Sequence, residues 1–422
     1  MFTQIIKTIW HQRRANGWIF AEILVVTGVL WYMADNLLVE YSVYNQPLGY
    51  DIENCWRLKL ANLDSDAPNY VPADNLSTTQ AEDLRTLIDH LRRDPLVDGA
   101  CAAYFSCPYS FGNSWGSLEP VEGDTAVARS QNYHVRRVTP EYFDVFRVKD
   151  KQGNALYPQL PTGEDCLVVS RDMETRFFGK AADGKGKLVR SNEEGESYPV
   201  AAVSEPVRFD DFSTAAPCYF QVVAAGQYAG LVDQFGADNA EVCIRMKRGM
   251  SQEEMNGFLE SMGERLTVNN LYVYGAVEIA AQRETRISGR INDAKIKIAL
   301  VSFMLINVFF GITGTFWLRT QYRRGEIGLR MSLGSSRRGI FRYMNEEGLC
   351  LLALSLPVLF LVTANMIYLD VLETVRLPIT VWRIASVCVG TYLLMAVMIF
   401  LGIWMPAQKA SSLPPAEALR YE

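Results

Sequence analysis

The chain has 422 residues, enough for a membrane-embedded part together with one or two folded domains. Lysine and arginine number 41 against 47 aspartates and glutamates, so the basic character of a nucleic-acid-binding protein is missing and no nucleic-acid partner is expected. The mean hydropathy is close to zero. This value suits neither an ordinary soluble enzyme nor a fully embedded transporter, and it indicates that apolar residues are clustered.

Four apolar stretches are long enough to cross the roughly 30 Å hydrocarbon core of a bilayer. They predict transmembrane helices at residues 18–38, 298–318, 348–369 and 384–404. The first stretch is the least apolar, and a signal peptide is the alternative for it. No small-residue cleavage site follows Tyr32, so a retained helix is favoured.

Glu22 is the one ionisable residue well inside a predicted span, which makes it a candidate functional residue. It lies about one turn from the end of the span. There it can reach the membrane surface or pair with Arg13 or Arg14, and this anchoring role is favoured over a role in transport.

The distribution of lysine and arginine predicts the orientation. Basic residues dominate residues 1–17, 319–347 and 405–422, which are therefore expected in the cytoplasm with both termini. Residues 39–297 and 370–383 are expected outside. Apolar residues at helical spacing also predict an amphipathic helix over residues 1–17, lying on the lipid surface.

The long outer segment contains two similar pieces. The first has a helix near residues 81–93, with a Thr79–Glu82 capping box, and a strand at 97–105. The second has a strand at 241–246, a helix at 252–266 capped by Ser251 and Glu254, and a strand at 271–280. Together they predict a split, ferredoxin-like α+β subdomain.

Between these pieces, residues from about 148 to 236 predict an inserted, mostly β subdomain. The fold class is thus a four-helix membrane bundle with a large α+β extracytoplasmic domain. A polar helical segment at 282–297 leads into the second span. It is either a continuous stalk or a simple connector, and the residues alone leave both open.

Six cysteines lie in the outer segment, and their spacing does not choose among fifteen pairings. Cys101 and Cys107 are close enough in sequence for a local bridge, but small buried thiols explain them equally well. Neither the cysteine spacing nor the three scattered histidines indicates a metal site.

No motif predicts a catalytic residue, a bound cofactor or an enzyme activity for this chain. Residues 179–185 have the GxxxxGK spacing of a phosphate-binding loop, but Gly186 stands where a serine or threonine would bind magnesium. This segment is interpreted as a turn.

The basic loop at residues 319–347 is the most informative segment. Ile327, Met331 and Ile340 form a small apolar stripe among charges, Gly334 is placed to end one helix, and Ser335 or Ser336 is placed to cap the next. Such a helix suits docking into a groove on a soluble partner. A solvated loop that follows the positive-inside rule is the alternative.

At this loop the sequence resembles the MacB/FtsX family of ABC transporter permeases. The resemblance lies in Arg323–Arg330 (RRGEIGLR) and Leu333–Arg337 (LGSSR). Further similar segments are VTPEYFDVF at 138–146, the runs at 168–170, 177–179 and 198–203, and the closing LPPAEALR at 413–420. Ser332 and Gly325 depart from the residues usual in the family.

The resemblance implies a permease subunit in the inner membrane of a bacterium with a periplasm. ATP and magnesium would be bound by a separate ABC ATPase, because no ATPase domain is fused to this chain. The implied ATPase-docking residues in a coupling helix within 326–338 are Glu326, Ile327, Gly328, Arg330, Leu333, Gly334 and Arg338.

Further implied partners are a second permease, identical or related, membrane lipids, and a periplasmic adaptor with an outer-membrane channel. Two functions fit the resemblance. One is a MacB-like exporter or mechanotransmission complex, and the other is an FtsX-like regulator that relays motion to a cell-wall enzyme. A membrane-anchored periplasmic enzyme is the third, disfavoured alternative.

Overall fold

The computed structural model describes residues 13–110, 112–121, 132–180, 183–191, 197–224 and 228–412. Most of the amphipathic helix predicted at 1–17 and the motif at 413–420 lie outside these residues. The chain divides into two compact units, a helical unit of residues 1–44 with 290–422 and a second unit of residues 45–289.

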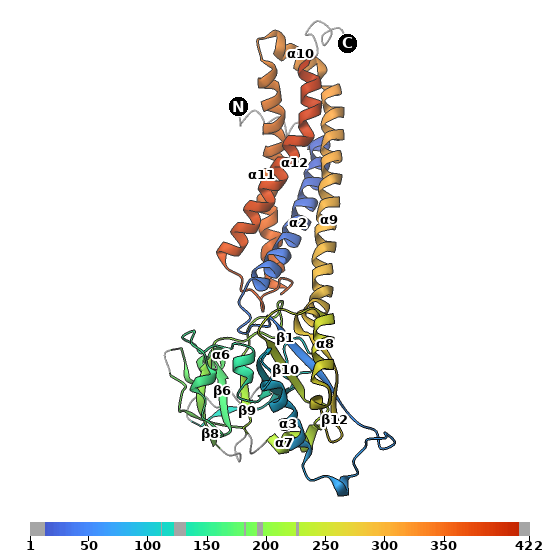
Figure 1. Cartoon of the computed structure of the whole chain (residues 1–422). Coiled ribbons are helices and arrows are strands. Elements are labelled where there is room, and N and C mark those ends of the chain that lie inside the picture. Colours follow the sequence, from blue (N-terminus) through green and yellow to red (C-terminus); the bar gives the residue numbers. More distant parts are fainter. Residues whose placement is uncertain are drawn as a thin grey trace. The chain divides into compact units, whose positions relative to one another are not determined.

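Four long helices are each long and apolar enough to cross a membrane. They are α2 (Arg13–Tyr44), α9 (Ile279–Tyr322), α11 (Arg337–Tyr368) and α12 (Val381–Ser412) (Figure 1). Each predicted span lies within one of these helices, apart from the last residue of the third span, which lies just beyond Tyr368. The helices extend past the predicted spans into polar sequence. Pro357 lies inside α11 without ending it.

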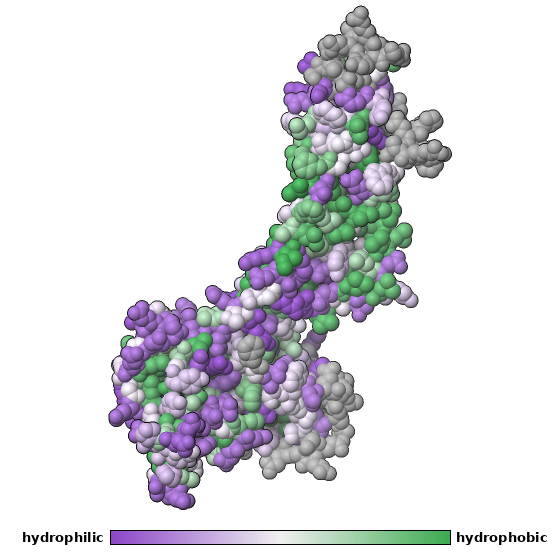
Figure 2. Space-filling view, turned by 90° about the vertical axis from the view of Figure 1, so that its right-hand side faces the viewer, coloured by the Kyte–Doolittle hydropathy of each residue, from purple (hydrophilic) through white to green (hydrophobic). Residues whose placement is uncertain are grey.

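Small residues let the helices of this unit pack closely. A Cβ atom on Gly348 of α11 would lie 2.7 Å from Ile399 of α12, and one on Gly402 of α12 would lie 2.9 Å from Ile312 of α9. Both distances are shorter than real contacts, so a larger residue at either glycine would displace the facing isoleucine. The outer surface of the unit is rich in exposed apolar side chains, as a lipid-facing surface would be (Figure 2).

The second unit is built on one mixed sheet with the strand order β11-β12-β1-β10-β2-β5-β9-β6-β8-β7-β4, where β11 is Thr267–Val268. Its first half interleaves two strand–helix–strand units. One consists of β1 (Cys55–Asn62), α3 (Gln80–Arg92) and β2 (Val97–Tyr104), and the other of β10 (Glu241–Met246), α8 (Gln252–Met262) and β12 (Leu271–Glu278). Neighbouring strands among β12, β1, β10 and β2 are antiparallel.

The helices of this half are capped as the sequence predicts. Thr79 and Glu82 form a reciprocal capping box at the start of α3, and Ser251 and Glu254 form one at the start of α8. One face of each strand joins the core beneath these helices, because side chains alternate along a strand.

The other half of the sheet has its own core. It contains β5 (Tyr133–Val138), which pairs parallel with β9 (Cys218–Val222), followed by β6 (Cys166–Ser170), β8 (Ser197–Ser204), β7 (Leu188–Arg190) and β4 (Glu119–Pro120). Helix α6 (Arg171–Phe178) contributes Met173 and Phe177 to this core.

The boundaries of this half differ from the predicted insertion at about 148–236. Its core already includes Leu118, Tyr133 and Val135. At the other end, α7 (Tyr228–Phe235) packs into the first core through Leu231 and Val232. The prediction missed this because β3 (Trp115–Gly116) and β4 have only two residues each and show no alternation.

Helix α9 is a single helix of 44 residues that includes the segment predicted as a stalk. Gly289 lies within it and does not end it. At 1.5 Å per residue its length is roughly 66 Å.

Candidate functional site

The loop at 319–347 folds into a short helix between two long ones. Helix α10 (Arg324–Ser332) follows α9 at once, and Gly334 then takes a φ of +96°, which favours glycine. Ser336 begins α11, because its side chain accepts a hydrogen bond from the Gly339 N–H at 3.1 Å. Of the two predicted caps, Ser336 therefore fills the position.

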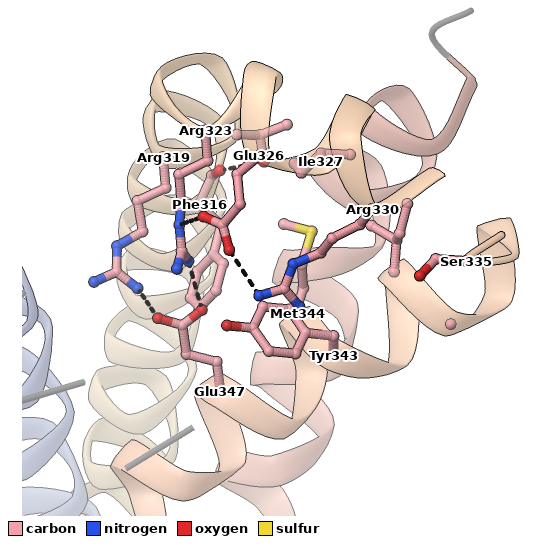
Figure 3. A pocket seen from close by; sticks show the side chains of 13 residues that line it. Phe316, Arg319, Arg323, Glu326, Ile327, Arg330, Ser335, Tyr343, Met344 and Glu347 are labelled. Atoms are coloured by element: carbon pink, nitrogen blue, oxygen red, sulfur yellow. Dashed lines mark hydrogen bonds and ion pairs between the residues drawn. The ribbon is translucent and has the colours of Figure 1, made fainter. Parts of the chain in front are cut away.

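A buried carboxylate connects α9 to α11 (Figure 3). Glu347 of α11 is 2% exposed and accepts hydrogen bonds from two arginines. Arg319 Nη1 of α9 lies 2.8 Å from Glu347 Oε1, and Arg323 Nη1, at the junction with α10, lies 3.0 Å from Oε2. A carboxylate held by two guanidinium groups is a strong, directional arrangement.

The same chain of charges continues onto α10. Arg323 Nε donates to Glu326 Oε2 at 3.0 Å, and Arg330 Nη2 donates to Glu326 Oε1 at 2.7 Å. The Arg330 guanidinium also lies 4.3 Å from the ring centre of Tyr343 on α11, a cation–π contact. Five charged side chains, called the arginine–glutamate network below, thus hold α10 against α9 and α11: Arg319, Arg323, Glu326, Arg330 and Glu347.

The network lines a pocket of about 190 Å³ beneath α10, together with Phe316, Ile340 and Met344. Within the described residues, Arg323 Nη2 and the Tyr343 hydroxyl are buried there without a hydrogen-bond partner. Apolar packing beneath α10 is therefore incomplete at this pocket.

The predicted docking residues separate into two groups. Ile327 and Met331 pack against the core of the helical unit, and Gly328 and Ile340 are buried. The predicted apolar stripe therefore faces the bundle and is not presented to a partner. Glu326 and Arg330 are half-buried in the network.

The exposed residues of the loop form the second group. Leu333 is 80% exposed and Leu329, one turn earlier, is 53% exposed. Gly334 and Arg338 are exposed beside them. Leu329 was missed, because the sequence does not say which way α10 is turned.

Glu22 lies against α9. A Cβ atom on Gly311 would collide with Glu22 Oε1, so the carboxylate occupies the space that the glycine leaves. The Arg13 and Arg14 side chains lie outside the described residues, and the anchoring role stays a prediction.

An ion pair at the other end of the bundle was not predicted. Asp35 of α2 and Arg383 of α12 each have side chains only 3% exposed. Arg383 donates to both Asp35 oxygens, at 2.8 and 2.6 Å, and to the carbonyls of Glu373 and Leu377 in the loop between α11 and α12. Because the two partners are 348 residues apart, no local pattern links them.

The GxxxxGK segment is not a phosphate-binding loop. It follows α6 and precedes β7, whereas a phosphate-binding loop joins a strand to the start of a helix. Its Asp183 pairs with Lys151, and its Gly184 N–H donates to Glu174 Oε1. Within the described residues, no group of side chains is arranged to hold a metal ion.

Within the second unit, Asp211 anchors the first turns of α9. Arg283 Nη2 lies 2.6 Å from Asp211 Oδ1, and the Tyr109 hydroxyl donates to Oδ2 at 2.8 Å. Burial raises the pKa of the Asp211 carboxyl, but these hydrogen bonds outweigh burial and hold the pKa below its ordinary value.

We expect Asp211→Asn to destabilise the protein by about 2 kcal/mol at neutral pH, since it removes a charged hydrogen-bond acceptor. In the wild type this contribution is complete above pH about 4 and is lost as the pH falls through the lower folded-state pKa. Thermal unfolding of the full chain in detergent at pH 7 and pH 3 checks this. The exposed Asp233→Asn is the matched control, and an equal loss in both variants at pH 7 would contradict the anchor.

Two solved structures are similar to part of this chain. One is the periplasmic region of MacB from Actinobacillus actinomycetemcomitans, at 12% identity and a TM-score of 0.32, covering 58% of this chain and 97% of that one. The other is a domain of a protein described as a permease from Porphyromonas gingivalis, at 13% identity and a TM-score of 0.34, covering 55% and 92%. No family model and no curated protein matches.

Proposed function

We propose that this chain is the permease subunit of an ABC complex of the MacB/FtsX type. It would lie in the inner membrane, with α10 in the cytoplasm and the second unit in the periplasm. The observation that carries the proposal is α10 itself: a short helix with the RRGEIGLR sequence, fastened to two spanning helices by the arginine–glutamate network, with Leu329 and Leu333 exposed.

The network gives α10 the properties that a coupling helix needs. An ATPase that binds ATP and magnesium would press on its exposed leucines. The ion pairs would pass the displacement to α9 through Arg319 and Arg323, and to α11 through Glu347. α9 would carry the movement along its unbroken length to the Asp211–Arg283 anchor.

This role divides the docking residues by task. Leu329, Leu333, Gly334 and Arg338 are proposed to touch the ATPase, while Glu326 and Arg330 orient α10. The interleaved units β1–α3–β2 and β10–α8–β12 are proposed to be the two parts of a ferredoxin-like, porter-type subdomain. A second permease would complete the dimer.

The test is affinity purification of the tagged full chain from mild detergent, with the recovered ATPase subunit and its activity measured. We expect Leu333→Asp to lower ATPase recovery about tenfold or more, because a charge replaces an apolar side chain at the proposed contact. Such a loss corresponds to about 1.4 kcal/mol of binding free energy or more.

The matched control is Val375→Asp. Val375 is 85% exposed in the loop between α11 and α12, at the other end of the bundle, so its recovery of ATPase should equal that of wild type. If the intact wild-type chain never brings an ATPase with it, the permease proposal fails. If it does and Leu333→Asp brings as much, only the assigned contact fails.

A further inference from the structure

Three cysteines from separate parts of the second unit meet on the face of the sheet that points away from α3 and α8. Cys101 on β2 stands directly opposite Cys243 on β10. Cys107 lies in the loop after β2, and its Sγ is 3.4 Å from the Sγ of Cys243. All three side chains are buried.

A buried carboxylate fixes the position of Cys107. Glu241 lies two residues before Cys243 on the same strand and therefore on the same face. Its Oε2 accepts hydrogen bonds from the backbone N–H groups of Ser106 and Cys107, both at 2.7 Å. The loop is thus held with the Cys107 thiol against that of Cys243.

We propose that Cys107 and Cys243 are joined by a disulfide in the mature protein, with Cys101 remaining as a free thiol beside it. The two sulfurs need to approach by about 1.4 Å to reach a bond length of about 2.05 Å. Cys107 is outside the strands, so it can make this shift without breaking ladder hydrogen bonds. Cys101 is held within β2 by the pairing with β10.

The bond would form by thiol–disulfide exchange with an oxidising protein that carries a disulfide. One cysteine thiolate attacks that disulfide, and the second cysteine resolves the mixed disulfide. Two protons and two electrons leave the chain, and the carrier is released as a dithiol. This step needs an oxidising compartment, so it rests on the periplasmic placement proposed above.

Because the Cys107 and Cys243 thiols are buried in the folded protein, the exchange can occur only before folding is complete. Burial raises the pKa of the Cys107 and Cys243 thiols, and it shields both from a protein-sized oxidant. The exchange must therefore precede closure of the loop over β10 during folding. Once made, the bond is equally shielded from reductants.

The test is disulfide mapping of the full-length protein. Cells are treated with an alkylating reagent under denaturing conditions, without reductant, and the purified chain is digested with trypsin and chymotrypsin. Trypsin alone leaves Cys101 with Cys107, and Cys218 with Cys243, whereas chymotrypsin can cut after Phe105 and Phe235 to separate them.

We expect a linked pair of peptides that contain Cys107 and Cys243, with Cys101 alkylated. Alkylation of both Cys107 and Cys243, or a bond from Cys101 to either, would overturn the proposal. Protease treatment of spheroplasts shows independently whether the second unit is outside, which separates a wrong pairing from a wrong orientation.

Stability provides a second measurement. A bond between residues 136 positions apart restricts the unfolded chain strongly, so Cys107→Ala should lower the unfolding midpoint by about 10 °C. Cys101→Ala, equally buried, is the control and should cost clearly less. The double variant Cys107→Ala/Cys243→Ala should lie close to the single variants, because either change breaks the bond. Fully additive losses would overturn the proposal.

Discussion

Glu347→Gln is expected to destabilise the helical unit by about 3–5 kcal/mol and to uncouple the ATPase. The substitution keeps the volume of the side chain but leaves Arg319 and Arg323 without their shared counter-charge in a largely buried site. Helix α10 then remains attached through Arg330 and the apolar contacts of Ile327 and Met331, so pressure on it would no longer move α9 and α11 together. Thermal unfolding in detergent and the ATPase activity of the purified complex measure the two effects.

Glu346→Gln supplies the matched control, because it makes the same change one residue earlier on the same helix. Glu346 pairs with Arg342, whose side chain is 76% exposed, so we expect a loss within about 0.5 kcal/mol and normal coupling. Equal behaviour of the two variants would show that the network does not hold α10. Adding Arg319→Gln to Glu347→Gln should recover part of the loss, since it removes one unpaired charge.

Arg383→Gln has the second large expected effect, about 3–5 kcal/mol, because it leaves Asp35 charged and buried without a partner. It also removes the donors that hold the carbonyls of Glu373 and Leu377. We therefore expect a lower unfolding midpoint and faster proteolysis within residues 370–380. Arg383→Lys should recover only part of both, since an ammonium group cannot reproduce the fork of contacts.

Arg376→Gln is the control for this pair. Arg376 lies in the same loop but pairs with Glu373 only three residues away, so its loss should cost less than about 1 kcal/mol. If Arg383→Gln unfolds and is cleaved like Arg376→Gln, the buried pair does not stabilise the bundle.

Features that depend on residues close together in the sequence could be predicted. The four long helices follow from apolar length, and both capping boxes follow from their spacing. The break at Gly334 was also predicted, and the cap was narrowed to Ser335 or Ser336, of which the structure has Ser336, because each feature depends on residues within one turn. For residues 282–297 the sequence left open a continuous stalk or a simple connector, and in the structure they are part of the continuous helix α9.

Features that depend on distant residues were not predictable. Helix α10 contacts Glu347 and Tyr343, which lie on the next helix, so local sequence did not show that Ile327 packs against the bundle. The Asp35–Arg383 pair and the contact between Cys107 and Cys243 join residues that are 348 and 136 positions apart. The extent of the β half was missed because strands of two residues carry too little pattern.

Because α9 is one continuous helix, its length also fixes the rotation between residues at its two ends. Each residue of a helix adds about 100° of rotation, so one inserted residue would rotate everything that follows it by that amount. Seven inserted residues, close to two full turns, would restore the direction to within about 20° and add only about 10 Å. Since α9 contains no proline to absorb a misfit, the coupling role proposed above would tolerate changes of stalk length only in steps near whole turns.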